Sequence, residues 1–256
     1  MRIPGAPGRR AAAGLVLALA LPALGYVLPV PGILKRAAAR RAELSLDALD
    51  VTGTLQAEGD AAARIAAVAG LRPGARVALP ARVAVKVPGR CRLELAPPDA
   101  AEADRPFVSL RDARLGGRGL DAIPAAVALV RAVCALLALP TGGEADVTWA
   151  EALSRRGVAL GDAELGRFNG RIAYVIGGRA RDTRPLAWFD KESFQPVRLQ
   201  SAEAGTLLDV RLLDWGSPTG GDFFPRAVEV WDRDALRLRF TTERAAANPR
   251  LPDALF

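Results

Sequence analysis

The most constraining feature of this chain is a pattern in its C-terminal part, where apolar and charged residues alternate along successive short runs. The runs span 185–199, 206–215 and 225–240. Alternation with a period of two predicts β-strands, because successive side chains of a strand point to opposite faces of the sheet. We therefore expect an antiparallel sheet with one hydrophobic face and one charged face.

Twelve apolar residues of these strands are predicted to share the hydrophobic face. They are Leu186, Trp188, Val197, Leu199, Leu208, Val210, Leu212, Val228, Val230, Leu236, Leu238 and Phe240. Two interpretations of this face are open. It is either the core, packed by the protein's own helix, or in part the lining of a cavity for an apolar ligand. The second arises because one helix covers only part of a wide, curved sheet.

Shorter runs earlier in the chain extend the predicted sheet, since they alternate in the same way or are bounded by Pro and Gly. The expected strands are Leu49–Gln56, Arg76–Leu79, Ala81–Val87, Arg90–Leu95, Phe107–Leu115, Val158–Leu160, Glu164–Phe168 and Arg171–Ile176. The alanine-rich stretch 60–70 is ambiguous between helix and strand.

The one long helical candidate is 120–139, which is apolar on nearly all sides and is therefore expected to lie under or inside the sheet. A shorter helix is predicted for 148–156. The predicted fold is mainly β (α+β). It is a large curved antiparallel sheet of about nine to eleven strands forming an unclosed half-barrel, with one or two mid-chain helices covering the concave face.

The N-terminal segment has the composition of an export signal. Arg9 and Arg10 precede an apolar run, 11–24, of the length found in signal peptides, and a basic cluster follows at 35–41. An uncleaved anchor is the alternative. We predict that 1–41 is a signal peptide or an N-terminal membrane anchor with a basic flank, and that 42–256 is a single domain.

The net charge of +7 does not indicate nucleic-acid binding. Residues 1–41 hold seven basic residues and no acidic one, which leaves 28 basic and 28 acidic residues in 42–256. A surface that follows a phosphate backbone requires clustered positive charge in the folded domain. No nucleic-acid partner is therefore expected.

The chain has two cysteines, Cys91 and Cys134. In an exported protein, two cysteines predict one disulfide, which would attach the long helix to the sheet. The alternative is a pair of buried free thiols. No cysteine follows the apolar run at a position where a lipid could be attached.

Little in the sequence favours catalysis. The absence of histidine excludes Ser-His-Asp and Cys-His sites and histidine metal sites, and no cysteine cluster or Gly-rich phosphate loop is present. Two carboxylates suffice for glycoside hydrolysis, and the candidate pairs are Asp190 with Glu192 and Glu229 with Asp232. Such pairs are far more often solvated strand ends. We predict a protein that is not an enzyme, with no catalytic residues, metal or cofactor.

The order of predicted strands in 185–256 and the sequence motif W-x-D-K-x-x-x-x-P-x-R resemble those of the LolA/LolB-like superfamily of outer-membrane lipoprotein-sorting proteins. In this sequence the motif consists of Trp188, Asp190, Lys191, Pro196 and Arg198. The order of predicted elements is similar over 45–256, but a resemblance in the amino-acid sequence itself is recognisable only over 185–256. The cysteine pair is not a feature of the carrier member, and the missing lipid-attachment cysteine argues against the membrane-anchored acceptor member.

The resemblance implies an unclosed barrel whose hydrophobic concave face, covered by helices, carries acyl chains of lipoproteins or other lipids across the periplasm. It implies a periplasmic monomer, with membrane-associated donor and acceptor proteins as further partners. An uncleaved N-terminal segment would tether it to the inner membrane. The alternative is a non-catalytic envelope scaffold or sensor of the same fold that binds a protein partner.

Overall fold

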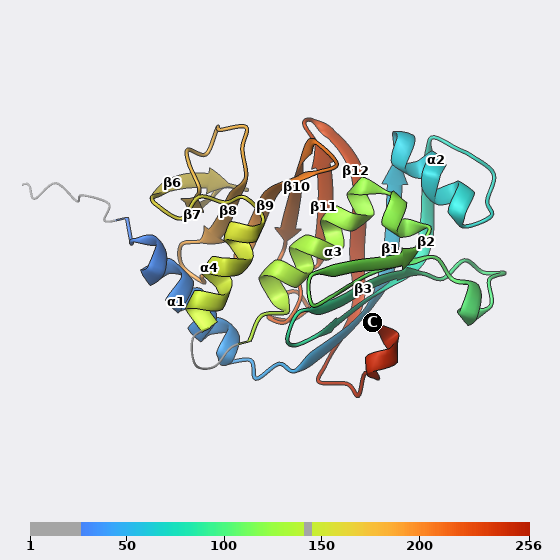
Figure 1. The fold of residues 1–256 in the computed structure, drawn as a ribbon, viewed down its shortest axis with the longest axis horizontal. Coiled ribbons are helices and arrows are strands. Elements are labelled where there is room, and N and C mark those ends of the chain that lie inside the picture. Colours follow the sequence, from blue (N-terminus) through green and yellow to red (C-terminus); the bar gives the residue numbers. More distant parts are fainter. Residues whose placement is uncertain (1–26, 141–144) are drawn as a thin grey trace, which may run out of the picture.

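The computed structural model describes residues 27–140 and 145–256, which form one twelve-stranded sheet with helices against it (Figure 1). The strands are β1 (Ala48–Glu58), β2 (Arg76–Lys86), β3 (Arg90–Leu95), β4 (Phe107–Arg111), β5 (Arg114–Arg118), β6 (Ala163–Phe168), β7 (Arg171–Ile176), β8 (Leu186–Asp190), β9 (Pro196–Glu203), β10 (Thr206–Leu213), β11 (Ala227–Asp232) and β12 (Ala235–Ala247). The α-helices are α1 (Val30–Ala42), α2 (Gly59–Val68), α3 (Pro124–Leu137) and α4 (Ala145–Arg155). The three short 3-10 helices are Glu102–Asp104, Leu120–Ala122 and Asp253–Leu255.

The strand order is β5-β4-β3-β2-β1-β12-β11-β10-β9-β8-β7-β6, and all neighbouring strands are antiparallel. The first and last strands, β1 and β12, pair with each other and join the two halves of the sheet. The first half consists of β1 to β5, and the second half of β6 to β12. The sheet does not close, because β5 and β6 remain as its edges. The predicted class, a mainly β protein with an unclosed antiparallel half-barrel, is confirmed.

Local details of the prediction were wrong in three places. The expected strand 107–115 is a hairpin, β4–β5, which turns at Asp112 and Ala113 with positive φ. The expected strand 158–160 has no strand pairing. Pro80 does not divide β2, because β3 pairs only with residues 81–86 of β2, and a proline is tolerated where a strand has a neighbour on one side only. In total the sheet has twelve strands, one more than the upper expectation.

Register shifts accompany the strong curvature of the sheet. One lies between Thr52 and Gly53 where β1 meets β12, another between Val230 and Trp231, and a third between Trp188 and Phe189. Such bulges bend a strand and increase its twist. Gly53 is required at the first shift, because a Cβ there would collide with the carbonyl oxygen of Thr241.

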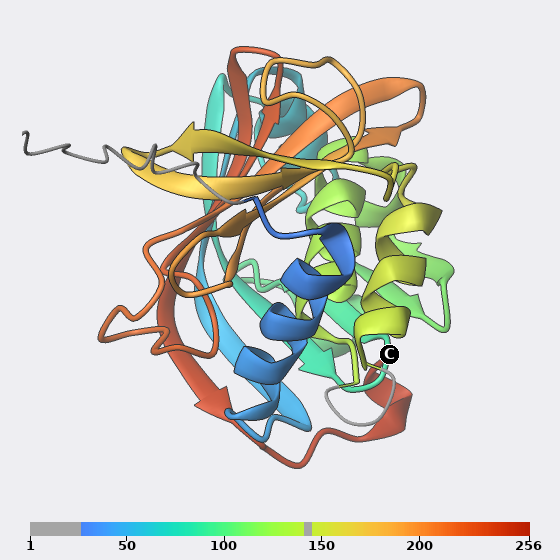
Figure 2. The same ribbon diagram turned by 90° about the vertical axis from the view of Figure 1, so that its left-hand side faces the viewer.

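The hollow of the curved sheet is filled by helices, which Figures 1 and 2 show gathered on its inner side. Helix α3 crosses the hollow and contacts β3 and β4 in one half of the sheet and β9 to β12 in the other. Helices α1 and α4 pack against each other, and α2 packs on β1, β2 and β12. Four α-helices in the described residues exceed the one or two expected, and the ambiguous stretch 60–70 is largely helix α2.

Residues 1–26 of the predicted leader, 1–41, lie outside the described residues. Its last part forms helix α1, where Ile33, Leu34 and Ala37 are buried in the main core cluster. No helix in the described ranges is long and apolar enough to span a membrane.

Candidate functional site

The inner face of the sheet carries eight of the twelve residues that the sequence assigned to one hydrophobic face. They belong to the main core cluster and are at most 4% exposed: Leu199, Leu208, Val210, Leu212, Val228, Val230, Leu238 and Phe240. Cross-strand pairs connect them, including Leu199 with Val210 and Val230 with Leu238. The period-two pattern therefore gave the correct inner face for β9 to β12, apart from two positions at bulges.

Three predicted residues lie on the outer face of the sheet. Leu186, Trp188 and Val197 form a second cluster, separate from the main core. Leu186 and Trp188 alternate with Ala187 and Phe189, and the latter two are the ones that belong to the main core. Every residue of β8 is buried, so the sequence pattern gave no sign of which face was inner.

Val197 and Leu236 are displaced by bulges. Val197 has no partner between the pairs Trp188–Arg198 and Phe189–Pro196, and it packs in the outer cluster with Trp188. Leu236 pairs with Trp231, the residue on the charged side of β11, after the shift at Val230. A one-residue shift moves a side chain to the opposite face, so both placements expected from simple alternation were wrong.

Sequence reasoning also missed inner-face residues on neighbouring elements. The main core cluster contains Tyr174, Ile176, Ala187 and Phe189, and Trp149 of α4 packs on Phe189 with ring centroids 5.6 Å apart. The run 171–176 has five apolar or aromatic residues after Arg171, so its pattern, like that of β8, did not indicate which face is the inner one.

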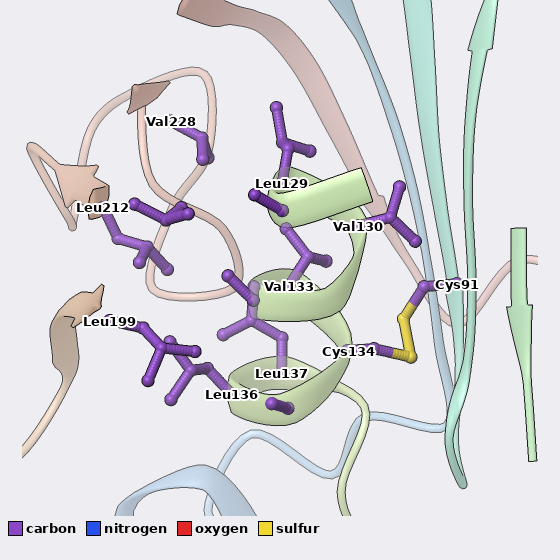
Figure 3. Close-up of a cluster of buried hydrophobic side chains, with 14 of the residues drawn as sticks. Cys91, Leu129, Val130, Val133, Cys134, Leu136, Leu137, Leu199, Leu212 and Val228 are labelled. Atoms are coloured by element: carbon purple, nitrogen blue, oxygen red, sulfur yellow. A yellow bond between two sulfur atoms is a disulfide. The ribbon is translucent and has the colours of Figure 1, made fainter. Parts of the chain in front are cut away.

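Helix α3 covers the inner face. Twelve of its 14 residues are buried, and its sequence is rich in alanine. Figure 3 shows its side chains meeting Leu199, Leu212 and Val228 on one side, while Cys134 points to the other. In this conformation the hydrophobic face is therefore packed by the protein's own helix, and a ligand would have to displace it.

The disulfide predicted from the two cysteines is confirmed. Cys134 near the end of α3 is bonded to Cys91 of β3, with Cα atoms 5.7 Å apart (Figure 3). The bond attaches α3 covalently to the first half of the sheet.

A buried carboxylate attaches both α3 and α4 to the second half of the sheet. Glu203, at the end of β9, has a side chain only 2% exposed. It pairs with Arg131 of α3, and its Oε1 lies 3.7 Å from Nη1 of Arg156, which follows α4. Because a buried carboxylate is costly without cationic partners, these two arginines hold the helices at this hairpin.

Arg41 fixes the position of α1. Its guanidinium donates hydrogen bonds to the carbonyl oxygens of Leu137, at the end of α3 (3.1 Å), and Phe223 (2.9 Å). Burial lowers the pKa of Arg41 to about 10, because the charged form loses its hydration. The residue thus connects α1, α3 and the 214–226 loop.

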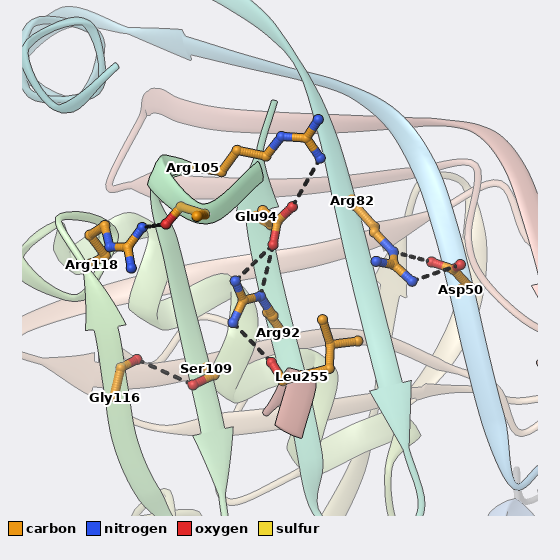
Figure 4. A network of polar contacts seen from close by, with 10 residues as sticks. Asp50, Arg82, Arg92, Glu94, Arg105, Ser109, Gly116, Arg118 and Leu255 are labelled. Atoms are coloured by element: carbon orange, nitrogen blue, oxygen red, sulfur yellow. Dashed lines mark hydrogen bonds and ion pairs between the residues drawn. The ribbon is translucent and has the colours of Figure 1, made fainter. Parts of the chain in front are cut away.

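On the strands β1 to β5, the outer face of the sheet is polar and is held by ion pairs (Figure 4). Glu94 accepts hydrogen bonds from Arg92 and Arg105, and Arg82 forms a bidentate pair with Asp50. Arg92 also donates to the carbonyl oxygen of Leu255, which ties the C-terminal tail to this face.

The acid pairs considered for hydrolysis are part of similar ion pairs. Asp190 and Glu192 both bind Arg171. In the second pair, Glu229 binds Arg239 and Asp232 binds Arg237. These contacts are typical of structural ion pairs on strands, so no observation here favours two-carboxylate chemistry.

Fold and site together define a class: an unclosed β half-barrel whose apolar inner face is covered by helix α3. No family model matches the sequence, and no curated protein matches it. Solved structures do match. A LolA superfamily protein from Nitrosomonas europaea is 14% identical, with a TM-score of 0.45, and the match covers 90% of this chain and 98% of that one.

Two other solved structures are similar over comparable lengths. A domain described as an outer membrane lipoprotein-sorting protein domain, from Vibrio parahaemolyticus, is 10% identical with a TM-score of 0.42 and covers 88% of this chain and 96% of that one. A DUF1329 family protein from Desulfovibrio piger is 11% identical with a TM-score of 0.42, and the match covers 90% of this chain and 98% of that one. These likenesses concern the LolA-like fold, and the function proposed below rests on this chain's own residues.

Proposed function

We propose that this protein is a periplasmic carrier or chaperone that binds acyl chains of lipoproteins, or of other lipids, on the inner face of its sheet. Its role would be the sorting of lipoproteins to the outer membrane. The observation that carries the proposal is the chemistry of the covered face, where the eight core residues of β9 to β12 are all aliphatic or aromatic. A continuous apolar face of this kind suits a hydrocarbon chain and offers nothing to a polar ligand.

The cover over this face is suited to being displaced. Five of the 14 residues of α3 are alanines, and an alanine buries less apolar area than leucine or valine. An acyl chain that replaced α3 would gain about 0.8 kcal/mol per buried CH₂. Exchange of one apolar surface for another keeps the net affinity moderate, as a carrier that must release its cargo requires.

The disulfide decides which side of α3 can open. Cys134 is bonded to β3, so the helix cannot leave the first half of the sheet. Separation on the other side requires loss of the contacts with β9 to β12 and with α4, of the Arg131–Glu203 pair, and of the hydrogen bond from Arg41 to the carbonyl oxygen of Leu137. We infer that acyl chains enter between α3 and β9–β11.

The test is binding of a fluorescent fatty acid to the purified protein and to variants of the inner face. Val210→Glu or Leu238→Glu places a charge on that face and should abolish binding. Because both residues are fully buried, unfolding is a risk. Val210→Thr is the milder variant, for which a cost of about 1–3 kcal/mol predicts about 5- to 150-fold weaker binding.

Val175→Thr is the matched control. Val175 is also completely buried, but it belongs to the outer cluster. It should lose similar stability and keep wild-type binding. Equal binding by folded Val210→Thr and wild type would contradict the proposal, as would equal loss in the two threonine variants. Recovery of a protein partner without lipid would instead support the envelope scaffold or sensor.

A further inference from the structure

A small groove lies on the outer side of α3, between this helix, α4 and the β4 hairpin; α3 and α4 run side by side in Figure 2. Its volume is about 70 Å³. Three arginines line it: Arg131, Arg155 and Arg156. The rest of its lining is apolar or backbone and includes Leu110 and Leu139, and no carboxylate of the described residues is part of it.

The charges around the groove do not balance. Arg131 and Arg156 share one carboxylate, Glu203, and Arg155 has only an exposed contact of 3.7 Å with Glu151. Among the described residues, three guanidinium groups thus face two carboxylates. The pKa of Arg156 is lowered, first by burial and then by the neighbouring charge of Arg131. An additional anion would stabilise all three cations.

The groove also has an unused hydrogen-bond donor. The Nε of Arg131 is buried and has no acceptor among the described residues. A buried donor without a partner is unfavourable, so an oxygen-rich ligand would gain from this position. Guanidinium groups suit phosphate and carboxylate groups, because their N–H groups match the spacing of two ligand oxygens.

We propose that this groove binds the anionic head group, a phosphate or a carboxylate, of the amphiphile that the protein carries. The inference rests on the proposed function and names its ligand class: acidic amphiphiles are preferred over neutral ones. The two arginines that share Glu203 also place this head-group site at the contact that holds α3 in position.

The test compares three probes by isothermal titration calorimetry below their micelle concentrations: dodecyl phosphate, dodecyl maltoside and inorganic phosphate. Dodecyl phosphate should bind about ten-fold more tightly than dodecyl maltoside at low ionic strength. Its advantage should shrink as salt is added, because the groove is partly open to solvent. Inorganic phosphate should bind much more weakly than dodecyl phosphate, since it lacks the chain.

The variant for locating the head group is Arg155→Gln, because the side chain of Arg155 is 56% exposed and its loss should not affect folding. We expect about three-fold weaker binding of dodecyl phosphate, and about ten-fold weaker binding for Arg155→Glu, from the energies of exposed ion pairs. Binding of dodecyl maltoside should not change. Arg64→Gln, at an exposed position on the distant helix α2, is the matched control.

The outcomes separate this inference from the proposed function. Equal affinity for the two dodecyl compounds, with loss of both in Val210→Thr, would overturn the head-group site and leave the inner face as the binding site. Equal affinity for inorganic and dodecyl phosphate would show a site for free anions only and overturn the inference. Unchanged binding in both Arg155 variants would overturn the assignment to this groove.

Discussion

Helix α3 is held by different interactions on its two sides. On the side of the first half of the sheet, it is covalently bonded through Cys134 and Cys91. On the side of β9 to β11, it is held by apolar contacts and by the pair of Arg131 with Glu203. A covalent bond persists during thermal motion, whereas apolar contacts can be exchanged for those of another apolar molecule. In the proposed function, α3 is therefore a cover with a fixed side and an opening side.

The two halves of the sheet also differ in the contacts that fix them. The outer face of the first half is further fixed by the C-terminal tail, where Lys86 donates to the carbonyl oxygen of Leu251 and pairs with Asp253. The inner faces of both halves are apolar, and the second half also carries Glu203, at the end of β9. In the proposed function, the first half acts as a frame and the second half provides the binding face.

The largest effect is expected from removal of the covalent bond. Cys91→Ala with Cys134→Ala should lower the free energy of unfolding by about 4 kcal/mol, as estimated for a loop closed between residues 43 apart. Urea unfolding measures this directly. Amide exchange in α3 should accelerate in the variant, because both sides of the helix could then separate. Equal stability of the double variant and wild type would remove the distinction between a fixed and an opening side.

Loss of the buried carboxylate should have an intermediate effect. Glu203→Gln keeps the size of the side chain but removes the charge that Arg131 and Arg156 share, so we expect a loss of about 1–3 kcal/mol in stability. It should also increase the rate of fatty-acid binding, because the opening side is released. Stopped-flow fluorescence measures the rate.

Glu151→Gln is the control for this substitution, since Glu151 is 62% exposed in its pair with Arg155. It should change neither stability nor the binding rate measurably. If Glu203→Gln binds fatty acid no faster than Glu151→Gln, the opening side has been placed incorrectly.

The smallest effect concerns the tail on the frame and depends on pH. Hydrogen bonds from Lys86 and Arg90 lower the pKa of Asp253 below its ordinary value of 3.8. A carboxyl group whose pKa is lowered by folding contributes stability above its ordinary pKa and loses that contribution as the pH falls through its folded value. The Tm of wild type should therefore exceed that of Asp253→Asn at pH 6, and the difference should shrink as the pH falls below 3.8. A difference that is independent of pH would contradict the role of this charge.

Much of the fold could be predicted from the sequence, because alternation and helical apolarity are local signals. These signals predicted the unclosed sheet and the buried helix α3, and the presence of two cysteines in a chain expected to be exported predicted the disulfide. The faces of Val197 and Leu236 could not be predicted, since each depends on a bulge formed with a neighbouring strand. Nor could the ambiguous pattern of β8 be assigned to a face, because both of its faces are buried.

The role of α1 was hidden for another reason. Its basic residues follow an apolar run, so the segment resembles the flank of a leader, and only the structure shows Arg41 buried between α3 and the 214–226 loop. The grouping of the three groove arginines could not be predicted from the sequence either, because Arg131, Arg155 and Arg156 meet only when α3 and α4 pack together.

Photo-crosslinking with a diazirine-labelled fatty acid, followed by peptide mapping, tests the central claim most directly. The account predicts saturable labelling of the inner face of β9 to β12 and of α3, competed by unlabelled fatty acid and lost in Val210→Thr but not in Val175→Thr. Labelling confined to the outer cluster around Trp188, or labelling that does not saturate, would contradict the claim that this face holds acyl chains.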